Sequence, residues 1–510
     1  MNARMARTLL TCASFAGAFP LAPAFAQQGA QPAASSGGLE EIVVTARRRE
    51  ERLQTVPVAV TAFTPKELQE KAIESASDVQ HYVPSLMSSQ QSRDEQVFYL
   101  RGQGPNGGSG GSPGVIAYFS EVPFIGSGPG IYFDLDNLQV LRGPQGTLFG
   151  QNTTGGAVLF EPKHPTNNFE GYAQVTLGDY DLQGFEGAVN VPIVEDKLLV
   201  RFAGTHVVRD GYTRNIGTGQ DQDNRDYWSG RLGVTWRPSD DFENYLVVDY
   251  LYSHTNGTGI VLQAVNPNVD PTLGAGFLQG SFARTFGVPT IEAALALQQQ
   301  LGNRTIDTNV DGLDKTESWG ITDIARWDIS SDLEFKNIAG YRELRNLLRG
   351  AFDGTIYDQG GSSTPSGWEI NNAQYSDEIQ LQGKSLDEKL TWIGGAFFEF
   401  LHPAGFTQAA VPSSTLIAGL PAQVVVFGNA YGQNALGPEG ETTRTEALFA
   451  QATYDLGGIS PVLDNLKLTA GARYTWDYRS NSNFSTIVIT LPAAFGGSNL
   501  TLPCGPASGL

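Results

Sequence analysis

The sequence has little of what an enzyme or a metal site needs. Its five histidines are scattered along the chain, and none has the spacing of metal ligands. Neither a phosphate-binding loop with its lysine nor the glycine-flanked serine of a nucleophile elbow occurs. We therefore predict that the protein is not an enzyme and that it has no catalytic residues, no cofactor and no bound metal.

Cysteine and long apolar runs are also scarce. Of the two cysteines, Cys12 lies in a segment that we expect to be removed, so no internal disulfide is expected from Cys504. After the first 26 residues, no stretch reaches the roughly 18 apolar residues that a membrane-spanning helix needs. A role in a membrane would therefore require a β-barrel.

Positively charged residues are fewer than negatively charged ones. Lysine and arginine number 33 against 53 acidic residues, which gives a net charge of -20, and loss of Arg4 and Arg7 with the first segment would make it -22. Binding of nucleic acid needs clustered cations, so we expect no nucleic-acid partner. Sixty glycines, with 10% aromatic and 17% charged residues, favour a β protein rich in turns.

The first 38 residues have the pattern of an export signal and a tether. Arg4 and Arg7 precede an apolar run, and Ala24-Phe25-Ala26 fits a signal-peptide cleavage site, so residues 1–26 are predicted to be a signal peptide. Residues 27–38, QQGAQPAASSGG, are predicted to be a flexible tether. Twelve residues are too few for an additional folded signalling domain, which argues for transport without transcriptional signalling.

Three motifs follow in order along the chain. Residues 39–48 read LEEIVVTARR, residues 100–102 read LRG, and residues 140–158 read VLRGPQGTLFGQNTTGGAV. The β-branched part of the first motif follows a flexible tether, so it could add as a strand to the edge of a partner's sheet. The alternative is that it is an ordinary first strand of the domain that follows.

These motifs resemble, in kind and order, those of TonB-dependent outer-membrane receptors. The resemblance implies an energy-coupling TonB box within residues 39–52, an α/β plug domain over 53–166 and a barrel from 167 to 510. The box residues are Glu41, Ile42, Val43, Val44, Thr45 and Ala46. The implied partners are TonB of the inner-membrane energy-transducing complex, outer-membrane lipid and a small-molecule ligand, with the protein in the outer membrane of a Gram-negative bacterium.

Local patterns predict the plug elements. A strand-like VPVAVTAF over 56–63 is followed by Thr64, Pro65 and Glu67, which predict a helix that begins with a capping box. Further short strands are expected near 97–101, 115–119, 138–142 and 157–160.

After residue 167 the pattern changes to long alternating strands. In 228–237, for example, Trp228 and Trp236 share an apolar face while Ser229 and Arg231 lie opposite, as in a lipid-facing barrel strand. Short turns alternate with long loops, which a large soluble β-sandwich, the alternative, does not require. Eleven strands are predicted, near 168–178, 182–194, 197–210, 225–237, 242–254, 315–329, 332–346, 371–383, 389–401, 442–456 and 464–478.

The fold class expected is an all-β transmembrane antiparallel barrel with an N-terminal α/β plug. Plugged outer-membrane transporters have 22 strands, so eleven strands and the loop-like residues 503–510 suggest that this sequence is a fragment. Asp323 falls on the apolar face of its strand, where a lipid-facing charge would cost roughly 2–4 kcal/mol, so a register slip at Gly320 is expected.

The resemblance also suggests site residues in the plug. Arg101 and Arg142 each end a predicted strand before a glycine, and plug arginines of the family commonly pair with barrel carboxylates, which makes Glu378 a candidate partner. The alternative is that both arginines are satisfied inside the plug. Residues 102–107 match GxGxxG, but no helix can begin after them, so a dinucleotide site is not expected there. Ligand contacts are expected from plug loops at Gln103, Pro105, Asn106, Phe124, Ile125, Ser127 and Pro129.

The function expected from these observations is TonB-dependent active transport of a scarce ligand, with a ferric siderophore or another iron complex as the default. The external loop 403–438 contains no Asp, Glu, Lys or Arg, which better suits a neutral aromatic or oligosaccharide nutrient. Two rival classes are a surface receptor that binds without translocating and a passive porin, which would lack both the plug and the TonB box.

Overall fold

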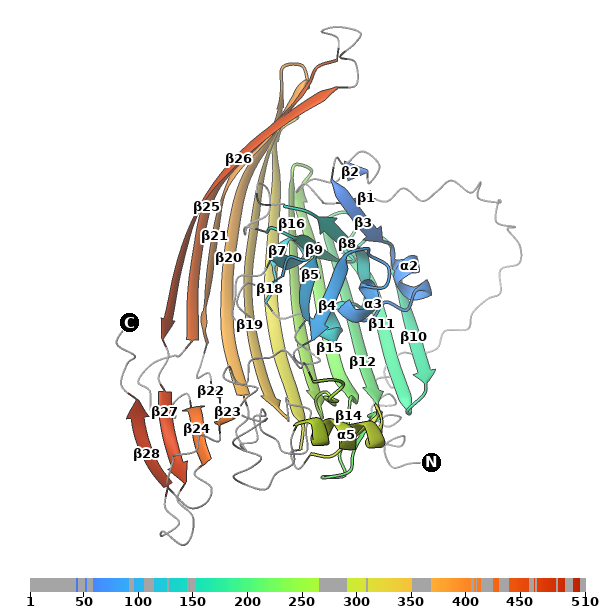
Figure 1. Ribbon diagram of the computed structural model, residues 1–510. Coiled ribbons are helices and arrows are strands. Elements are labelled where there is room, and N and C mark those ends of the chain that lie inside the picture. Colours follow the sequence, from blue (N-terminus) through green and yellow to red (C-terminus); the bar gives the residue numbers. More distant parts are fainter. Residues whose placement is uncertain are drawn as a thin grey trace, which may run out of the picture. The chain divides into compact units, whose positions relative to one another are not determined.

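The computed structural model, shown in Figure 1, contains two units, Met1–Glu41 and Ile42–Leu510. The predicted signal peptide and tether lie outside the described residues, as does most of the loop 403–438. Among the helices described, none is long and apolar enough to cross a membrane. The described residues are 43–44, 51–52, 58–90, 96–104, 114–125, 128–144, 146, 153–265, 291–308, 311–350, 368–404, 408–409, 411–413, 425–430, 440–457, 463, 466–482, 485–490 and 499–504.

The plug is a small α/β unit built on a five-stranded sheet. Its strand order is β3-β8-β9-β6-β7, with β4 and β5 forming a separate antiparallel pair. The plug strands predicted from the sequence are confirmed, with shifts of a few residues at their ends. The bounds are β3 Ala59–Phe63, β4 Leu86–Gln90, β5 Gln96–Leu100, β6 Val115–Phe119, β7 Val122–Pro123, β8 Leu135–Arg142 and β9 Gly156–Pro162, with the 3-10 helix η2 Pro129–Ile131.

The first plug helix begins as its sequence predicts. Helix α2 (Pro65–Glu70) has Thr64 as N-cap, and the Thr64 hydroxyl accepts from the Glu67 N–H while the Glu67 carboxylate accepts from the Thr64 N–H at 3.0 Å. A second short helix, α3 (Ala76–Val79), follows. Leu68 and Val79 are buried in the plug core, so the capping box holds the end of a helix that contributes to this core.

The charge of this capping box makes helix α2 sensitive to pH. The Thr64 backbone N–H lowers the pKa of Glu67 from its ordinary value of 4.5, and Lys71 lowers it further. The stabilisation is therefore complete above that value and is lost as pH falls through the lower folded-state pKa. We expect Glu67→Gln to reduce hydrogen-exchange protection of α2 at pH 7, by a factor that corresponds to about 0.5 kcal/mol. The difference between the two proteins should shrink as pH falls below 4.5, and a difference that did not shrink with falling pH would contradict the assignment.

Glycine is required inside the 140–158 motif. Gly156 has φ +149°, and a Cβ on it would lie 2.0 Å from the Leu141 carbonyl oxygen and 2.7 Å from Leu100 Cδ2. No side chain fits between these atoms, because the carbonyl belongs to the neighbouring strand β8. The two motifs that contain Leu100 and Gly156 are thus packed against each other in the plug core.

Gly156→Ala is expected to destabilise the plug by about 3 kcal/mol or more, because strand β8 must move to admit the methyl group. Limited proteolysis of the protein should cut the plug of this variant at lower protease concentration. Gly204→Ala in β12 is the matched control, since the nearest atom to its Cβ would be 3.6 Å away. Equal protease resistance of Gly156→Ala and the parent would contradict the requirement for glycine.

The second part of the chain forms a long antiparallel sheet, here called the wall, in which eleven strands follow one another in chain order (Figure 1). These are the eleven strands that the alternation predicts. Their bounds are β10 Glu170–Gly178, β11 Leu182–Val194, β12 Leu198–Arg209, β15 Arg225–Ser239, β16 Phe242–Thr255, β18 Leu313–Ser330, β19 Leu333–Arg349, β20 Trp368–Ser385, β21 Leu390–Pro403, β25 Gly440–Asp455 and β26 Lys467–Ser482.

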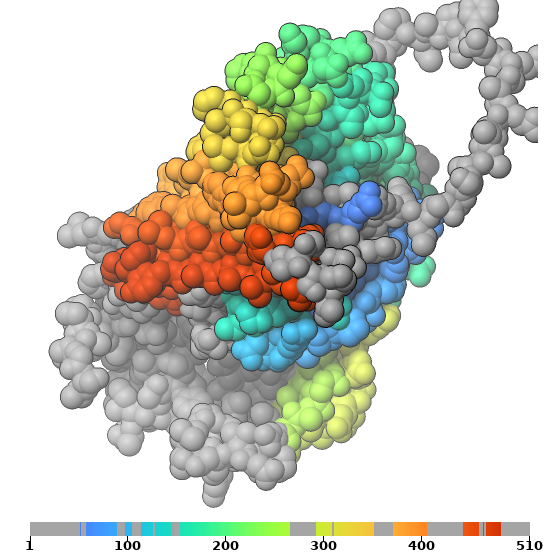
Figure 2. Space-filling view, turned by 90° about the horizontal axis from the view of Figure 1, so that it is seen from above, coloured from blue at the N-terminus to red at the C-terminus, as the bar shows by residue number. Residues whose placement is uncertain are grey.

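The two faces of the wall differ as the alternation predicts. On β15, Trp228 and Trp236 are about half exposed on one face, whereas Ser229 and Arg231 are buried on the other. The buried face lies against the plug, whose segments are blue and cyan beside the green-to-red wall in Figure 2. The apolar face therefore points away from the plug and is exposed.

The register slip expected at Gly320 is wrong. Strand β18 pairs with β19 without interruption from Leu313 to Asp328, so Asp323 does point to the apolar face. Its carboxylate accepts from Asn244 Nδ2 on the adjacent β16, at 3.0 and 2.9 Å. A polar neighbour on the next strand, rather than a change of register, accommodates the charge.

Smaller sheets occur beyond the wall strands. Strands β13 (Thr213–Asn215), β14 (Asp221–Gln222) and β17 (Thr305–Ile306) form one of them, and helix α5 (Ile291–Leu301) directly precedes β17. Another contains β23 Val411–Ser413, β24 Val425–Ala430, β27 Ser485–Thr490 and β28 Asn499–Cys504, and β22 (Gln408–Ala409) pairs with β20.

Candidate functional site: the plug and wall interface

Apolar side chains of the wall complete the plug core. Tyr245 and Val247 of β16, Ile324 of β18 and Ile338 of β19 are each no more than 4% exposed and belong to the same buried cluster as the plug residues. Each of them takes an inward position in its strand, where the alternation would otherwise place a polar residue. The plug and this part of the wall therefore share one core.

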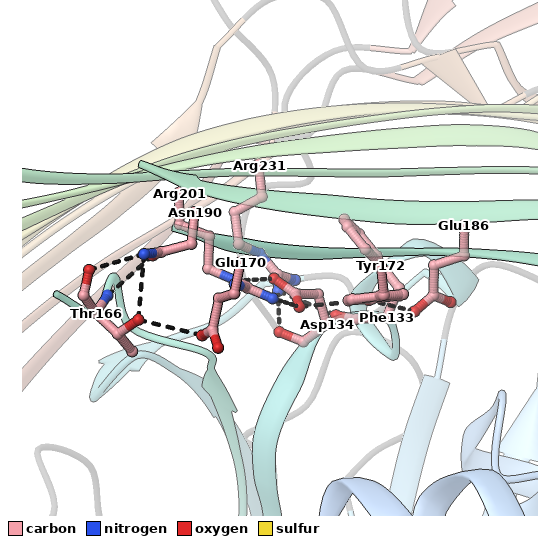
Figure 3. A network of polar contacts seen from close by, with 9 residues as sticks. All are labelled: Phe133, Asp134, Thr166, Glu170, Tyr172, Glu186, Asn190, Arg201 and Arg231. Atoms are coloured by element: carbon pink, nitrogen blue, oxygen red, sulfur yellow. Dashed lines mark hydrogen bonds and ion pairs between the residues drawn. The ribbon is translucent and has the colours of Figure 1, made fainter. Parts of the chain in front are cut away.

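A buried ion pair joins the plug to β12. The Arg201 guanidinium donates to both oxygens of Asp134, with Nε to Oδ2 at 2.8 Å and Nη2 to Oδ1 at 2.5 Å (Figure 3). The two side chains are only 3% and 2% exposed. A planar guanidinium that meets a carboxylate in this two-bonded manner fixes both position and orientation.

Arg231 on β15 holds the same plug segment through its backbone. Its Nη1 donates to the carbonyl oxygens of Phe133 and Asp134 at 3.0 and 3.2 Å, and its Nη2 donates to that of Ile131 at 3.4 Å. The guanidinium carbon also lies 4.5 Å from the Phe133 ring centroid. The backbone carbonyl groups at and after the end of η2 therefore all bind one side chain of the wall.

Further polar contacts surround Asp134 (Figure 3). The Tyr172 hydroxyl on β10 lies 2.7 Å from Glu186 and 3.3 Å from Asp134. In the connection between plug and wall, Asn190 of β11 accepts from the Thr166 N–H at 2.9 Å and donates to the Thr166 carbonyl at 2.7 Å. The first two wall strands thus bind both the plug and the segment that leaves it.

A second buried ion pair lies at the β6–β7 turn. Lys336 Nζ on β19 is 2.7 Å from both oxygens of Glu121, and Arg326 on β18 is 3.8 Å from the nearer one. Glu121 has φ +67° and the preceding Ser120 has φ +47°, so this tight turn aims the carboxylate at the wall. Plug carboxylates and wall cations meet at both ends of the segment 121–134.

This polarity is the reverse of the expected pairing, in which plug arginines meet a wall carboxylate. Arg142 Nη2 donates to Thr61 Oγ1 at 3.3 Å, inside the plug. Arg101 lies beside Gly143, which is also in the plug, because its Nη1 is 3.1 Å from the position that a Cβ on Gly143 would take. Glu378 faces inward on β20, is 2% exposed and accepts from Gln380. Pairing of Arg101 or Arg142 with Glu378 stays a prediction.

The other predicted site residues are spread over the plug. Phe124 is half-buried beneath Arg342, whose guanidinium carbon is 4.4 Å from the ring centroid and which also pairs with Asp249 at 2.6 Å. Ile125 and Pro129 are half-buried, and Gln103 is exposed, with its Oε1 3.4 Å from Thr154 Oγ1. Residues outside the described part are Pro105, Asn106 and Ser127.

Of the predicted TonB box, Val43–Val44 are described. They form β1, which pairs antiparallel with β2 (Glu51–Arg52), so this segment takes an extended conformation as its β-branched residues predict. The box residues Glu41, Ile42, Thr45 and Ala46 lie outside the described residues. Within the part of the chain that the structure describes, no group of His, Cys, Asp or Glu side chains is arranged to bind a metal ion.

Comparison with known proteins supports the plug and wall architecture. Residues 52–157 match the TonB-dependent Receptor Plug Domain family. The chain is 24% identical to the ferripyoverdine receptor of Pseudomonas aeruginosa over 181 residues. This aligned region covers 34% of this chain and 22% of that protein. It is 28% identical over 111 residues to the pesticin receptor of Yersinia enterocolitica, covering 22% and 16%.

Solved structures show the same fold. The ferric yersiniabactin uptake receptor of Yersinia pestis superposes with a TM-score of 0.61 at 15% identity, over 88% of this chain and 60% of that one. The ferric preacinetobactin receptor of Acinetobacter baumannii gives 0.58 at 16% identity, over 88% and 63%. The chain therefore spans about 60% of the length of these receptors.

The fold is thus that of a plugged outer-membrane β-barrel, of which the wall is a part. Residues 52–157 are thus a plug domain of the TonB-dependent receptor type, and the chain is similar to these receptors. TonB-dependent receptors bind small-molecule ligands, and one solved structure is that of the ferripyoverdine receptor of the outer membrane of Pseudomonas aeruginosa bound to ferripyoverdine.

Proposed function

We propose that this protein transports a ferric siderophore or a related iron complex across the outer membrane, with energy supplied through TonB. The observation that carries the proposal is a plug anchored by buried ion pairs to a wall with an apolar outer face. A plug held in this way closes a channel and has to be moved by work. The extended Val43–Val44 segment precedes the plug, where a pulling partner could add a strand.

The remaining parts of the proposal follow from the sequence. The signal peptide 1–26 directs export, residues 41–46 are the TonB box, and ligand binds between the outer loops and the plug. The role is transport rather than catalysis. Relatives that are receptors for ferripyoverdine, ferric yersiniabactin and ferric preacinetobactin support an iron complex as the ligand.

A neutral nutrient is the second candidate, because the loop 403–438 has no charged residue. An iron chelate that carries negative charge would be attracted by cations, which this loop does not offer. The ligand in that case would be an aromatic compound or an oligosaccharide.

Growth and uptake tests separate these candidates. Deletion of the gene should slow growth on iron-limited medium, and uptake of radioactive iron chelates by the parent should stop when the proton gradient is dissipated. Uptake that continues without the gradient would indicate a passive pore. Growth that responds to a carbon source and not to iron would support the neutral nutrient.

A further inference from the structure

Two carboxylates lie at one level on the outward face of the wall. Asp323 of β18 and Asp377 of β20 both pair in register with Ala339 of β19, which separates them. Adjacent strands are about 4.8 Å apart, so the backbones that carry the two carboxylates are roughly 10 Å apart. The alanine between them is short, so one approaching group can meet both. Exposed apolar side chains surround the pair, namely Ile321, Ile379 and Phe398.

This level is the middle of the band that the barrel fold turns toward lipid. Trp319 and Trp327 lie on the same face of β18, four residues before and four residues after Asp323. Eight residues of a strand span about 26 Å, and the apolar band of an outer-membrane barrel, about 25 Å tall, lies between two such aromatic girdles. Along the strand, Asp323 is therefore about 13 Å from each tryptophan.

Neighbouring carboxamides give these carboxylates hydrogen bonds but no opposite charge. Asn244 Nδ2 donates to both oxygens of Asp323 at 3.0 and 2.9 Å, and Asn337 Nδ2 donates to one oxygen of Asp377 at 2.6 Å. Among the described residues, neither carboxylate pairs with a lysine or an arginine. Charged side chains at the depth of lipid tails are rare, and those that occur have partners and mark functional sites.

The sign and spacing of the two charges indicate the kind of partner. Charged lipid head groups lie at the interface and do not reach the middle of the apolar band. A second copy of this face would bring four carboxylates together, which repel one another in a medium of low dielectric constant. The ammonium group of lysine donates in three directions from a slim stem and suits two separated carboxylates, whereas a planar guanidinium suits a single one.

We propose that the outward face around Asp323 and Asp377 binds a second membrane-spanning protein, which presents a lysine to lipid at mid-depth. The ammonium group lies over Ala339 and donates to both carboxylates. The proposal goes beyond transport, because it places a partner beside the protein in the plane of the membrane. It depends on the barrel fold and not on the ligand that is transported.

Energy transfer in liposomes tests the proposal with a defined probe. The probe is a synthetic membrane-spanning helix of about 20 leucine residues with one central lysine and an acceptor dye. The protein carries a donor dye at Ser331→Cys, in the exposed turn between β18 and β19, with Cys504→Ser. The lysine helix should bind at a peptide-to-lipid ratio about ten-fold lower than the same helix with norleucine at its centre. Equal binding of the two helices would overturn the proposal.

Variants locate the surface that binds the probe. Asp323→Asn with Asp377→Asn removes both charges and keeps the size of the side chains, so this double variant should bind the two helices equally. Asp387→Asn, the matched control, makes the same change in the exposed turn between β20 and β21 and should keep the preference for lysine. A preference that survives in the double variant would show that lysine binds elsewhere, against the proposal.

Chemical coupling in outer membranes identifies the natural partner. Dicyclohexylcarbodiimide enters the apolar region and activates a carboxylate, and attack by an adjacent lysine amine then forms an amide and releases dicyclohexylurea. We expect Asp323 or Asp377 to be joined to a lysine in a membrane-spanning segment of another protein, with no such product in the double variant. Coupling to a second copy of this chain, or no product in the parent, would contradict the proposal.

Discussion

Ile42→Pro is expected to abolish energy-dependent uptake and to leave binding of ligand at the cell surface intact. Proline removes a backbone N–H and so removes one hydrogen bond from any strand that this segment adds to a partner's sheet. Val43–Val44, directly after it, already form an extended strand. The measurement is uptake of radioactive ligand by energised cells, compared with surface binding in cells whose proton gradient is dissipated.

The matched control is a proline at another position before the plug. Ala33→Pro lies within the predicted tether 27–38, where no strand pairing is expected, and it should transport as the parent does. Normal uptake by Ile42→Pro would remove the TonB-box assignment. Loss of uptake in both variants would indicate that any proline before the plug interferes.

Asp134→Ala is expected to reduce the free energy of interaction between the plug and the wall by about 3–5 kcal/mol. The substitution leaves the Arg201 guanidinium buried with no carboxylate at the place that Asp134 occupied, and removal of one member of a buried pair costs this much. We therefore expect the plug of this variant to open without energy supplied through TonB. Cells that produce this variant should become sensitive to antibiotics that are too large for porins, and the measurement is the minimum inhibitory concentration.

Two further variants separate the charge from the general effect of a substitution. Asp134→Leu combined with Arg201→Met replaces the pair by apolar side chains and should restore much of the barrier. Glu74→Gln breaks the exposed pair with Arg225 and should have almost no effect. Equal sensitivity of Asp134→Ala and the parent would show that this pair does not hold the plug.

Local patterns predict much of this fold. Each wall strand buries one face, so apolar and polar residues alternate along its sequence. That alternation alone predicts that Arg231 lies on the inner face. The capping box of α2 depends only on Thr64 and Glu67, three residues apart. Such features are visible in a sequence because the residues that make them are neighbours or repeat with a fixed period.

The two buried ion pairs between the plug and the wall could not be predicted in the same way. Asp134 and Arg201 are 67 residues apart, and Glu121 and Lys336 are 215 apart. Their pairing depends on which wall strand faces which plug turn, and local periodicity contains no such information. The useful signal is the presence of inward basic residues on strands whose inner face is otherwise small and polar. The prediction for Asp323 fails for a related reason, since Asn244 lies on another strand.

Asn190 has a consequence for how the molecule assembles. This side chain, on the second wall strand, binds the Thr166 N–H and carbonyl and also the carbonyl of Asn168 at 2.5 Å. The β10–β11 hairpin is a local structure, which forms faster than pairings between distant parts of a chain. The point where the plug leaves the wall is therefore fixed as soon as this first hairpin has formed.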